Sequence, residues 1–445
     1  MKLIEALNIL NWTGVSIDSR KLNPGELFIA IIGERFDGHD FVKQAFDNGA
    51  CAAVVSHQPD SCQDNQPLIY VEDTQKALYD LALYYRETLT LPVAALTGSC
   101  GKTTTKQMTA SILGERYRVY STPGNLNNHL GAPLSVLNCK QNNEAAVFEL
   151  GANHPGEIRS NVKLVQPKTA LITNVAPAHI GVFGSLEAIF LAKSEIFEGL
   201  PNDGWAIYNR DDNFADLWKA NLSRCQALTF GLGPEADVSA ETIKFDHQMQ
   251  ASFSLKTPQG SVSVQLPFAG RHNVMNALAA AAIGLTFNLS LDEIASGLRK
   301  ATGISGRMTF KTGIAGSRII DDTYNANLSS VDAAIEVLSK FSGKRFLVLG
   351  DLAELGDWTE AHHRLIGKNA GLSGLDGLFT CGSASRYASE SFGDKGFSRH
   401  FEDHFSLLEA LKDRLASDVT VLVKGSRSSH MENVVDAITL FSDIK

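Results

Sequence analysis

Residues 96–104 combine the residue types and spacing of a phosphate-binding loop. They read Leu-Thr-Gly-Ser-Cys-Gly-Lys-Thr-Thr and join a predicted strand, 93–97, to a predicted helix, 102–113. Backbone N–H groups and the positive end of the helix dipole can converge on a polyphosphate at such a junction. Lys102 would reach the terminal phosphates, and Thr103 would hold Mg²⁺. The predicted ATP-binding loop comprises Thr97, Gly98, Ser99, Cys100, Gly101, Lys102, Thr103 and Thr104.

This loop departs from the strict P-loop pattern, whose first glycine would fall at Leu96. An incidental Gly-Lys-Thr turn is the alternative, and the position of the loop between a strand and a helix argues against it. The loop alone indicates only phosphate binding, so an ATPase or nucleotide-dependent switch that ligates nothing stays open. We interpret Cys100 as a small residue tolerated in the loop.

Glu149 is a candidate metal ligand near this loop. It lies at the end of a predicted buried strand, 145–150, at the sheet edge where open α/β folds build their ligand sites. Mg²⁺ prefers hard oxygen ligands such as carboxylates. Taken alone, an acidic residue at a strand end is more often simply solvated.

The elements that would position these residues divide the chain into three α/β domains. Short β-like runs and turn signals fill residues 1–88, and strands alternate with helices in residues 89–312 and again in 313–445. Such alternation predicts mostly parallel sheets with helices on their faces. We expect a small first domain, a central P-loop ATPase-like domain and a C-terminal Rossmann-like domain.

Four further expectations concern individual elements. Residues 26–32 and 170–175 are predicted to form buried strands, and residues 186–200 a helix that carries Lys193. Between residues 238 and 268 the apolar pattern switches to period two, which predicts an antiparallel sub-sheet.

The composition is that of a globular protein that binds small molecules. Of the 445 residues, 44% are hydrophobic and 20% charged, and the net charge is -9. Affinity for nucleic acid depends on many Lys and Arg contacts to phosphates, so no nucleic-acid partner is expected. The six cysteines are scattered singly, without the paired spacing of a zinc site, and are predicted to be free thiols.

No membrane segment or export signal is expected. The most continuous apolar run, 277–285, is far shorter than the ~20 residues that cross a bilayer. The first ten residues, MKLIEALNIL, include Glu5 and lack a small-residue cleavage pattern. We therefore expect a cytoplasmic protein, and we expect a monomer.

Taken together, the motifs resemble those of the Mur ligase family, which builds the peptide of bacterial cell walls by ATP-driven amide formation. The resemblance covers nearly the whole chain. It is carried by the loop 97–103, Gly124-Asn125, Glu149, His179, Lys193, Gly270-Arg-His-Asn273 with Asn276, Gly306-Arg307 and Asp322. It implies that a carboxylate is activated by ATP as an acyl phosphate and then captured by an amine.

Four stretches are similar to the branch of the family that adds D-alanyl-D-alanine to UDP-N-acetylmuramoyl-tripeptide. They are residues 122–128, 149–153, 321–327 and 349–356, and the Asp-Asn-Pro-Arg motif of the diaminopimelate-adding branch is absent from the sequence. A ligase of the same family with a different added unit stays open. A silent scaffold that binds UDP-sugars is disfavoured because candidate phosphate, metal and adenine residues are all present.

The resemblance also implies the membership of the nucleotide and metal sites. Beyond the loop, ATP would be contacted by Asn125, Asn273, Asn276, Arg307 and Asp322. Mg²⁺, as two ions, would be held by Thr103, Glu149, His179 and Lys193. A free ammonium would be repelled by Mg²⁺, and in the family this lysine is carbamylated to an anion. The residues expected to act in catalysis are Lys102, His179, Lys193 and Arg307.

Without the resemblance, several of these residues have plainer interpretations. Lys193 fits a solvated helix lysine, and His179 fits a hydrogen-bonded structural histidine. His362 and His363, adjacent on a predicted helix, face different directions and are interpreted as ordinary surface or packing residues.

Substrate contacts are expected in all three domains. The UDP-sugar would meet Ser19, Arg20, Arg35, Asp37 and His39 in the first domain. Further substrate contacts are expected at Asn127, Asn128, Asn325, Asn327, Asp351 and Glu354. The last four, proposed for the dipeptide, fit equally well as capping and turn residues. Because Asp322 and Lys102 belong to different predicted domains, ATP would bridge the two and catalysis would need domain closure.

Overall fold

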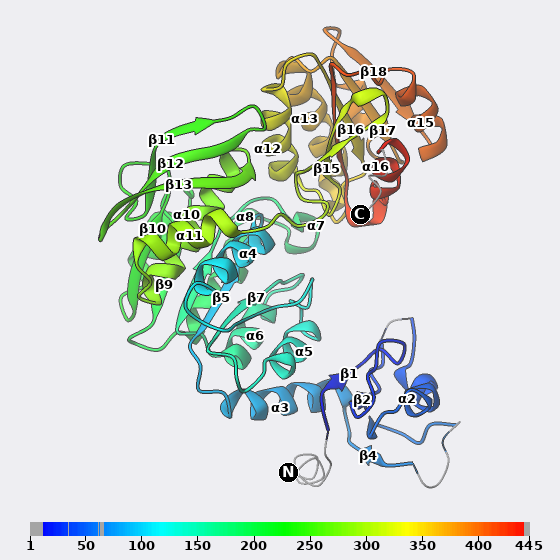
Figure 1. The fold of residues 1–445 in the computed structure, drawn as a ribbon. Helices are drawn as coiled ribbons and strands as arrows, with labels where there is room; N and C mark the ends of the chain where they lie inside the picture. The colour runs from blue at the N-terminus through cyan, green and yellow to red at the C-terminus, as the bar shows by residue number, and fades with distance from the viewer. Residues whose placement is uncertain (1–11, 34, 61, 63–65, 440–445) are drawn as a thin grey trace.

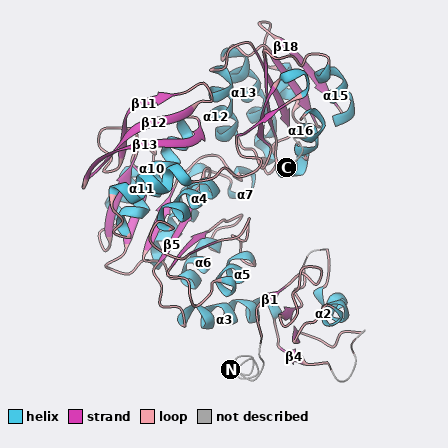
Figure 2. Ribbon diagram, viewed as in Figure 1, coloured by secondary structure: helices cyan, strands magenta, loops and turns pink. Residues whose placement is uncertain are grey.

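Four β-sheets organise the chain in the computed structural model, which describes residues 12–33, 35–60, 62 and 66–439 (Figures 1 and 2). A four-stranded parallel sheet defines the first unit. A six-stranded parallel sheet and a three-stranded antiparallel sheet define the central unit, and a six-stranded mixed sheet defines the third unit. The expected three-part α/β architecture is confirmed. The ten amino-terminal residues, on which the expectation about export rests, lie outside the described residues.

The first unit has the strand order β1-β2-β3-β4, with every pair parallel. Its strands and its small helix are β1 (Val15–Ser16), β2 (Leu27–Ile29), β3 (Ala52–Val55), β4 (Leu68–Tyr70) and α2 (Val42–Asp47). The strand expected over residues 26–32 is shorter, because the chain turns back after Ile29. The N–H of Gly38 donates to the carbonyl of Ile31, and Ile32 forms a bridge with Asp37.

The helix α3 (Thr74–Glu87) joins the first unit to the central one and packs beneath α5 and α6 (Figure 1). Leu78 and Leu81 belong to the same hydrophobic core as Leu137 and Phe148 of the central unit. The buried guanidinium of Arg86 donates to the carbonyls of Val165, Leu89 and Gln166 at 2.8, 2.9 and 3.2 Å. The helix is therefore fixed to the central unit by both apolar and polar contacts.

The central parallel sheet has the order β10-β9-β8-β5-β7-β6. The phosphate loop follows β5, which lies between β8 and β7. Its strands are β5 (Val93–Thr97), β6 (Val119–Ser121), β7 (Ala145–Glu149), β8 (Thr169–Ile172), β9 (Trp205–Asn209) and β10 (Gln226–Phe230). The middle strands are apolar on both faces, as expected for a sheet covered by helices. These helices are α4 (Lys102–Leu113), α5 (Gly131–Asn138), α6 (Glu157–Val165), α9 (Ala215–Asn221), α10 (Arg271–Thr286) and α11 (Leu291–Lys300).

The predicted antiparallel sub-sheet is confirmed. It consists of β11 (Ser239–Phe245), β12 (Gln250–Thr257) and β13 (Gly260–Ala269). Buried Phe253 and Leu255 alternate with more exposed neighbours along β12, so one face packs on the core and the other faces outward. This sheet lies over α10 and α11 on the outer side of the central unit (Figure 1).

The segment between β8 and β9 differs from the expected single helix over residues 186–200. After a short α7 (Ile180–Phe183), the chain forms α8 (Leu186–Ser194) and continues as the 3₁₀ helix η2 (Glu195–Gly199). The carboxylate of Glu195 accepts the N–H groups of Gly156 and Arg159 at the start of α6. The change from α to 3₁₀ geometry thus occurs at the residue whose side chain binds the start of α6. Lys193 lies in the last turn of α8 and is buried.

The third unit has the strand order β14-β15-β19-β16-β17-β18, with only β14 antiparallel. Its strands are β14 (Thr309–Thr312), β15 (Arg318–Asp322), β16 (Lys344–Gly350), β17 (Gly377–Cys381), β18 (Phe397–Phe401) and β19 (Val419–Lys424). Its helices are α12 (Leu328–Ser339), α13 (Thr359–Leu372), α14 (Arg386–Glu390), α15 (His404–Lys412) and α16 (Glu432–Ile438). The predicted border after residue 312 leaves β14 on the central side, whereas that strand pairs within the third sheet.

Two properties of the whole chain complete the fold. The six cysteines are free thiols, as expected. Within the described part of the chain, the helices are too short or too polar to cross a bilayer.

Candidate active site

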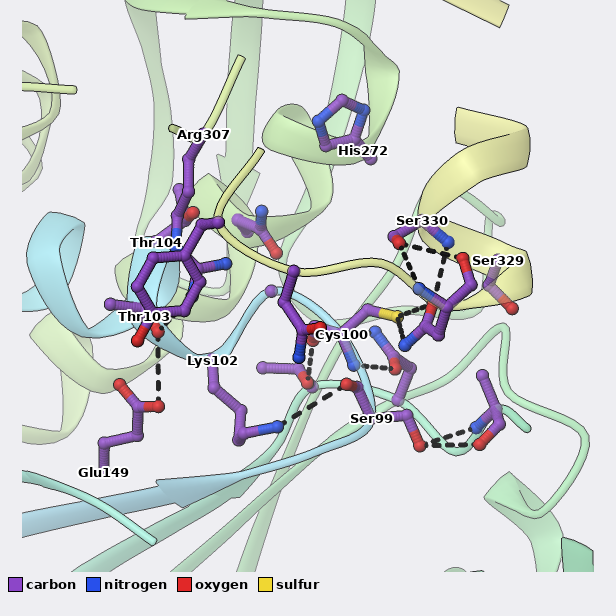
Figure 3. A pocket seen from close by; sticks show the side chains of 18 of the residues that line it. Ser99, Cys100, Lys102, Thr103, Thr104, Glu149, His272, Arg307, Ser329 and Ser330 are labelled. Carbon is purple, nitrogen blue, oxygen red and sulfur yellow. Dashed lines mark hydrogen bonds between the residues drawn. The ribbon is translucent and has the colours of Figure 1, made fainter. Parts of the chain in front are cut away.

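A cavity of about 1040 Å³ opens where the carboxyl ends of the central strands meet the start of the third unit. Its walls come from the phosphate loop, the first turns of α10, and segments of the third unit between residues 304 and 333. The close view in Figure 3 shows Lys102, Thr103 and Glu149 near one another, with Ser329 and Ser330 of α12 beyond the loop. A volume of this size suits a nucleotide or a similarly large ligand.

The backbone of the phosphate loop requires glycine at two positions. Gly98 has φ +150° and Gly101 has φ +80°. A Cβ on Gly98 would lie 1.8 Å from Oγ1 of Thr173, and one on Gly101 would lie 2.2 Å from Oδ1 of Asn276. The loop therefore lies directly against the end of β8 and the first turns of α10, and the side chains of Thr173 and Asn276 leave no room for a larger residue at either position.

Hydrogen bonds from the end of β8 fix the same loop. The N–H of Ser99 donates to the carbonyl of Asn174 at 3.0 Å, and the N–H of Cys100 donates to Oδ1 of the same asparagine at 2.9 Å. The hydroxyl of Thr173 donates to the carbonyl of Cys100 at 2.6 Å. The strand expected over residues 170–175 ends at Ile172 because these next residues turn to hold the loop.

Lys102 begins α4 and lines the cavity. Its Nζ donates to the carbonyl of Gly98 at 2.7 Å, so the amine lies over its own loop. Burial lowers the pKa of Lys102, and the charge of Glu149 opposes that shift. An ammonium held in this position can stabilise negative charge on phosphate oxygens.

Glu149 is buried beside the loop, because β5 and β7 pair Leu96 with Glu149 in register. Its Oε1 accepts hydrogen bonds from the hydroxyl of Thr103 at 3.2 Å and from Nδ2 of Asn127 at 2.9 Å. Its Oε2 is buried without a hydrogen bond and lies 3.3 Å from Nζ of Lys106. A buried carboxylate next to a threonine hydroxyl fits a divalent cation with oxygen ligands.

Lys106 is a functional candidate that the sequence reasoning missed. It lies one turn after Lys102 on the inner face of α4, and its side chain is 4% exposed. Its Nζ donates to the carbonyl of Thr122 at 2.7 Å and lies 3.3 Å from Oε2 of Glu149. A lysine on the buried face of a helix, where an apolar residue is expected, is the signal that could have identified it.

Arg307 connects the third unit to the phosphate loop. Its Nη2 donates to the hydroxyl of Thr103 at 2.9 Å, and its guanidinium lies 4.2 Å from the centroid of the Tyr324 ring. Its Nε is buried without a hydrogen bond. The side chain thus presents a fixed cation at the cavity wall opposite β5.

Lys193 is buried at the cavity with its amine unpaired among the described residues. Burial, followed by the nearby charge of Lys102, lowers the pKa of Lys193 to about 7. The plainer interpretation, a solvated helix lysine, is therefore wrong, because the side chain is only 4% exposed. A substantial fraction of the amine is neutral near pH 7.

His179 lines the cavity and forms an ion-pair contact through Nδ1 with the carboxylate of Glu354 in the third unit. Glu354 does not line the cavity, although the sequence placed it among the substrate contacts. The contact with His179 lowers the pKa of Glu354.

Asp322 and Lys424 form a buried ion pair at the ends of β15 and β19. Nζ of Lys424 lies 2.6 Å from Oδ2 of Asp322 and donates to the carbonyl of Asn325 at 3.0 Å. Both residues line the cavity. Lys424 ends an apolar strand, as Glu149 does, so the same signal could have found it. His272 also lines the cavity and was not predicted, and burial lowers its pKa to about 4.

Most of the predicted nucleotide, metal and ligation residues come together in this cavity. Its lining includes Ser99, Cys100, Gly101, Lys102, Thr103, Thr104, Asn125, Asn127, Asn128, Glu149, His179, Lys193, Asn273, Asn276, Arg307, Asp322, Asn325 and Asn327. Several of the asparagines also have local roles. Oδ1 of Asn327 caps α12 by accepting the N–H of Ser330, and Oδ1 of Asn128 accepts the N–H of Gly131.

The remaining predicted residues lie elsewhere. Thr97 and Gly98 support the loop from behind and do not line the cavity. The carboxylate of Asp351 accepts the backbone N–H groups of Ser383, Ala384 and Ser385 at 2.7–3.0 Å, so it braces a loop of the third unit.

The predicted UDP-sugar residues are all in the first unit, away from this cavity (Figure 1). Ser19 is buried and donates to Oε1 of Gln44 at 2.7 Å, whereas Arg20 is exposed and pairs with Asp18. His39 is buried, with Asp37 at its Nδ1 and the N–H of Ser56 at its Nε2. Arg35 is exposed.

Family models match three consecutive parts of the chain. The Mur ligase family, catalytic domain, matches residues 11–86, the Mur ligase middle domain matches residues 96–284, and the Mur ligase, glutamate ligase domain, matches residues 306–427. The matched segments follow the order of the three structural units.

Curated relatives are similar over almost the full length. A UDP-N-acetylmuramoyl-tripeptide--D-alanyl-D-alanine ligase from Escherichia coli is 43% identical over 429 residues, which cover 95% of this chain and 93% of the relative. The ligase of the same name from Bacillus subtilis is 38% identical and covers 95% of this chain and 92% of the relative.

Solved structures are also similar to this chain over almost its full length. MurF from Acinetobacter baumannii superposes with a TM-score of 0.88 at 40% identity and covers 95% of this chain and 92% of its own. MurF ligase from Thermotoga maritima in complex with ADP has a TM-score of 0.85 at 27% identity and covers 97% of both chains. On this evidence the chain belongs to the Mur ligase family.

Proposed function

We propose that this chain uses ATP to ligate D-alanyl-D-alanine to UDP-N-acetylmuramoyl-tripeptide, giving UDP-N-acetylmuramoyl-pentapeptide, ADP and phosphate for peptidoglycan synthesis. The observation that carries the proposal is a single cavity lined by the phosphate loop, by the buried carboxylate of Glu149, and by residues of the third unit. The names of the relatives at 43% and 38% identity support the choice of substrates.

The first step activates the tripeptide. An oxygen of its terminal carboxylate attacks the γ-phosphorus of ATP, the bond from that phosphorus to the bridging oxygen breaks, and ADP leaves. Lys102 and Arg307 provide fixed positive charge for the phosphoryl oxygens. Bound Mg²⁺ would neutralise further phosphate charge, with Thr103 and Glu149 as its nearest oxygen ligands on this wall.

The second step forms the amide. The amine of D-alanyl-D-alanine attacks the acyl carbon, loses a proton, and displaces phosphate. Asn325 and Asn327 lie on the third-unit side of the cavity and are our candidates for positioning the dipeptide. The same wall carries Arg307, so the leaving phosphate stays close to a cation.

We also propose that Lys193 functions as a carbamate. Its neutral amine attacks CO₂, and loss of one proton leaves an anion that can face a second Mg²⁺ beside His179. The burial of Lys193 supports this, because a pKa of about 7 makes the neutral amine available near neutral pH. The expectations of two metal ions, of a cytoplasmic location and of a monomer stay predictions.

Each unit has a part in this proposal. We assign the UDP-sugar to the first unit, ATP to the central unit, and the dipeptide to the third unit. The cavity between the central and third units supports the last two assignments. The assignment of the UDP-sugar rests on the resemblance of residues 18–20 and 35–39 to the family.

The first experiment measures phosphate release and product mass. The purified protein is incubated with ATP, Mg²⁺ and UDP-N-acetylmuramoyl-tripeptide, with and without D-alanyl-D-alanine. We expect phosphate release to require both substrates and a pentapeptide mass to form. Phosphate release without the dipeptide and without a ligated product would instead indicate an ATPase or a different amine.

A loop variant tests the chemistry of the same reaction. Lys102→Ala removes the cation over the phosphate loop, and we expect it to abolish ligation while the fold is retained by circular dichroism. Lys140→Ala, at an exposed lysine outside the cavity, is the matched control and should retain activity. Ligation by Lys102→Ala at the control's rate would contradict the assigned role.

A further inference from the structure

A loop of the third unit docks directly on α7 of the central unit. The N–H of Gly181 donates to the carbonyl of Glu354 at 3.1 Å. A Cβ on Gly181 would lie 2.6 Å from the backbone nitrogen of Gly356. The two backbones therefore approach so closely that a side chain at position 181 would separate them.

Apolar side chains seal this contact. Ile180 of α7 and Leu352 and Leu355 of the loop belong to one hydrophobic core and are 6%, 4% and 3% exposed. Their burial stabilises the docked arrangement independently of any charge at the site.

The contact also sets the surroundings of His179, the residue before α7. Its Nδ1 is buried without a hydrogen bond and lies in ion-pair contact with the carboxylate of Glu354, and the residue lines the active-site cavity. Because one ring nitrogen faces the third unit, Nε2 is the nitrogen left for the cavity.

Glu354 is presented by a braced loop. His363 accepts the N–H of Leu352 at its Nε2 and contacts the carbonyl of Thr359 through Nδ1, at 3.1 and 2.7 Å. The hydroxyl of Ser426 donates to the carbonyl of Asp351 at 2.6 Å. These bonds hold the backbone on either side of Glu354, whereas its carboxylate is in contact with His179.

We propose that Glu354 is a positioning residue for the ligation reaction, through which the third unit orients the His179 imidazole of the central unit with Nε2 toward the cavity. A carboxylate at Nδ1 favours the tautomer with the proton on Nδ1, which leaves the lone pair of Nε2 free. The kinetic consequence rests on the proposed function, whereas the tautomer does not. Docking of the third unit and orientation of His179 are therefore linked.

The direct test is the tautomer of His179 in the full-length protein with ADP and Mg²⁺. Histidine labelled with ¹⁵N reports the protonated nitrogen by NMR, and loss of one signal in His179→Gln assigns it. We expect a proton on Nδ1 in the wild type and a shift toward the Nε2-protonated form in Glu354→Ala. Identical His179 signals in the two proteins would overturn the proposal.

Kinetics provide the second test. We expect Glu354→Ala to lower kcat about 10- to 100-fold, the usual range for loss of a residue that orients a metal-site histidine, with a smaller change in KM for ATP. Glu354→Asp should recover part of the loss. Glu360→Ala is the matched control, since the side chains of Glu354 and Glu360 are 49% and 53% exposed.

Gly181→Val tests the docking separately. It keeps both His179 and Glu354 but forces the two backbones apart, so we expect the same change of tautomer as in Glu354→Ala. An unchanged tautomer in this variant, with the fold retained, would show that docking does not orient His179. Absence of ligation in the wild type would refute the proposed function and leave the NMR result to decide the positioning role.

Discussion

Lys193 shows how burial prepares a single side chain for chemistry. Its amine is enclosed near Lys102, and both burial and that neighbouring charge favour the neutral form. A neutral amine is the nucleophile that carbamate formation needs, whereas an ammonium is not. The residue type alone could not reveal this, because the same lysine on an exposed helix face would stay charged.

A variant and a pH series test this residue. Lys193→Ala should lose most ligation activity, and small carboxylic acids should restore part of it. In wild-type protein at fixed bicarbonate, carbamate formation should increase from pH 6 to pH 8, because the amine loses its proton around a pKa of about 7. Rates after removal and return of CO₂ measure the effect. Lys163→Ala, at an exposed lysine, is the control, and unchanged activity of Lys193→Ala would remove this residue from the site.

The loop around Glu354 shows what is decided at the scale of one element. Its support includes His363, which is fully buried with both ring nitrogens engaged. From the sequence, His363 was interpreted as either a packing or a surface residue, and the structure shows that it is buried. The sequence did not predict its hydrogen bonds, because one of them comes from Leu352, 11 residues away along the chain.

This arrangement predicts a pH dependence of stability. Burial lowers the pKa of His363, so the unfolded chain binds a proton more readily than the folded one as the pH falls below about 6.5. Stability should therefore be lost as the pH drops from 6.5 toward 5. Urea unfolding at pH 7.5 and pH 5 measures it, and His363→Gln should show a smaller loss than the wild type. An equal loss in both proteins would show that other histidines, such as His272, account for the effect.

Elements were predictable from sequence where the local apolar pattern determines them. Residues 93–97 and 102–113 form β5 and α4 as expected, because continuous burial and a glycine-containing junction are local features. The ends of β8 and α8 were not predictable in the same way, because contacts with other elements determine them. β8 ends at Ile172 where the chain turns to hold the phosphate loop, and α8 ends at Ser194 where Glu195 serves the start of α6.

At the scale of the whole molecule, the site exists only where two units meet. Thr103 of α4 and Arg307 of the third-unit side are joined by a hydrogen bond of 2.9 Å, although 204 residues separate them along the chain. Sequence motifs identified both residues through resemblance to a family. Their contact is a property of the tertiary structure, and local periodicity carries no information about it.

Ligand binding should therefore stabilise the joined units. ADP at about 100 times its Kd should add about 2.7 kcal/mol to the free energy of unfolding, because it binds only the folded protein. Arg307→Ala should reduce the increase at the same ADP concentration, since the cation at the phosphates is lost. Thermal unfolding with and without ADP measures both. Arg299→Ala, at an exposed arginine, is the control, and an equal shift in Arg307→Ala would show that this residue does not contact the nucleotide.

The buried guanidinium of Arg86 has a practical consequence for protein engineering. Because α3 is held by carbonyls of the central unit and by a shared core, a chimera that exchanges the first unit between relatives should be spliced ahead of Thr74. A splice after Glu87 would carry a foreign helix into the central core. The natural junction for recombination is therefore the short connection between β4 and α3.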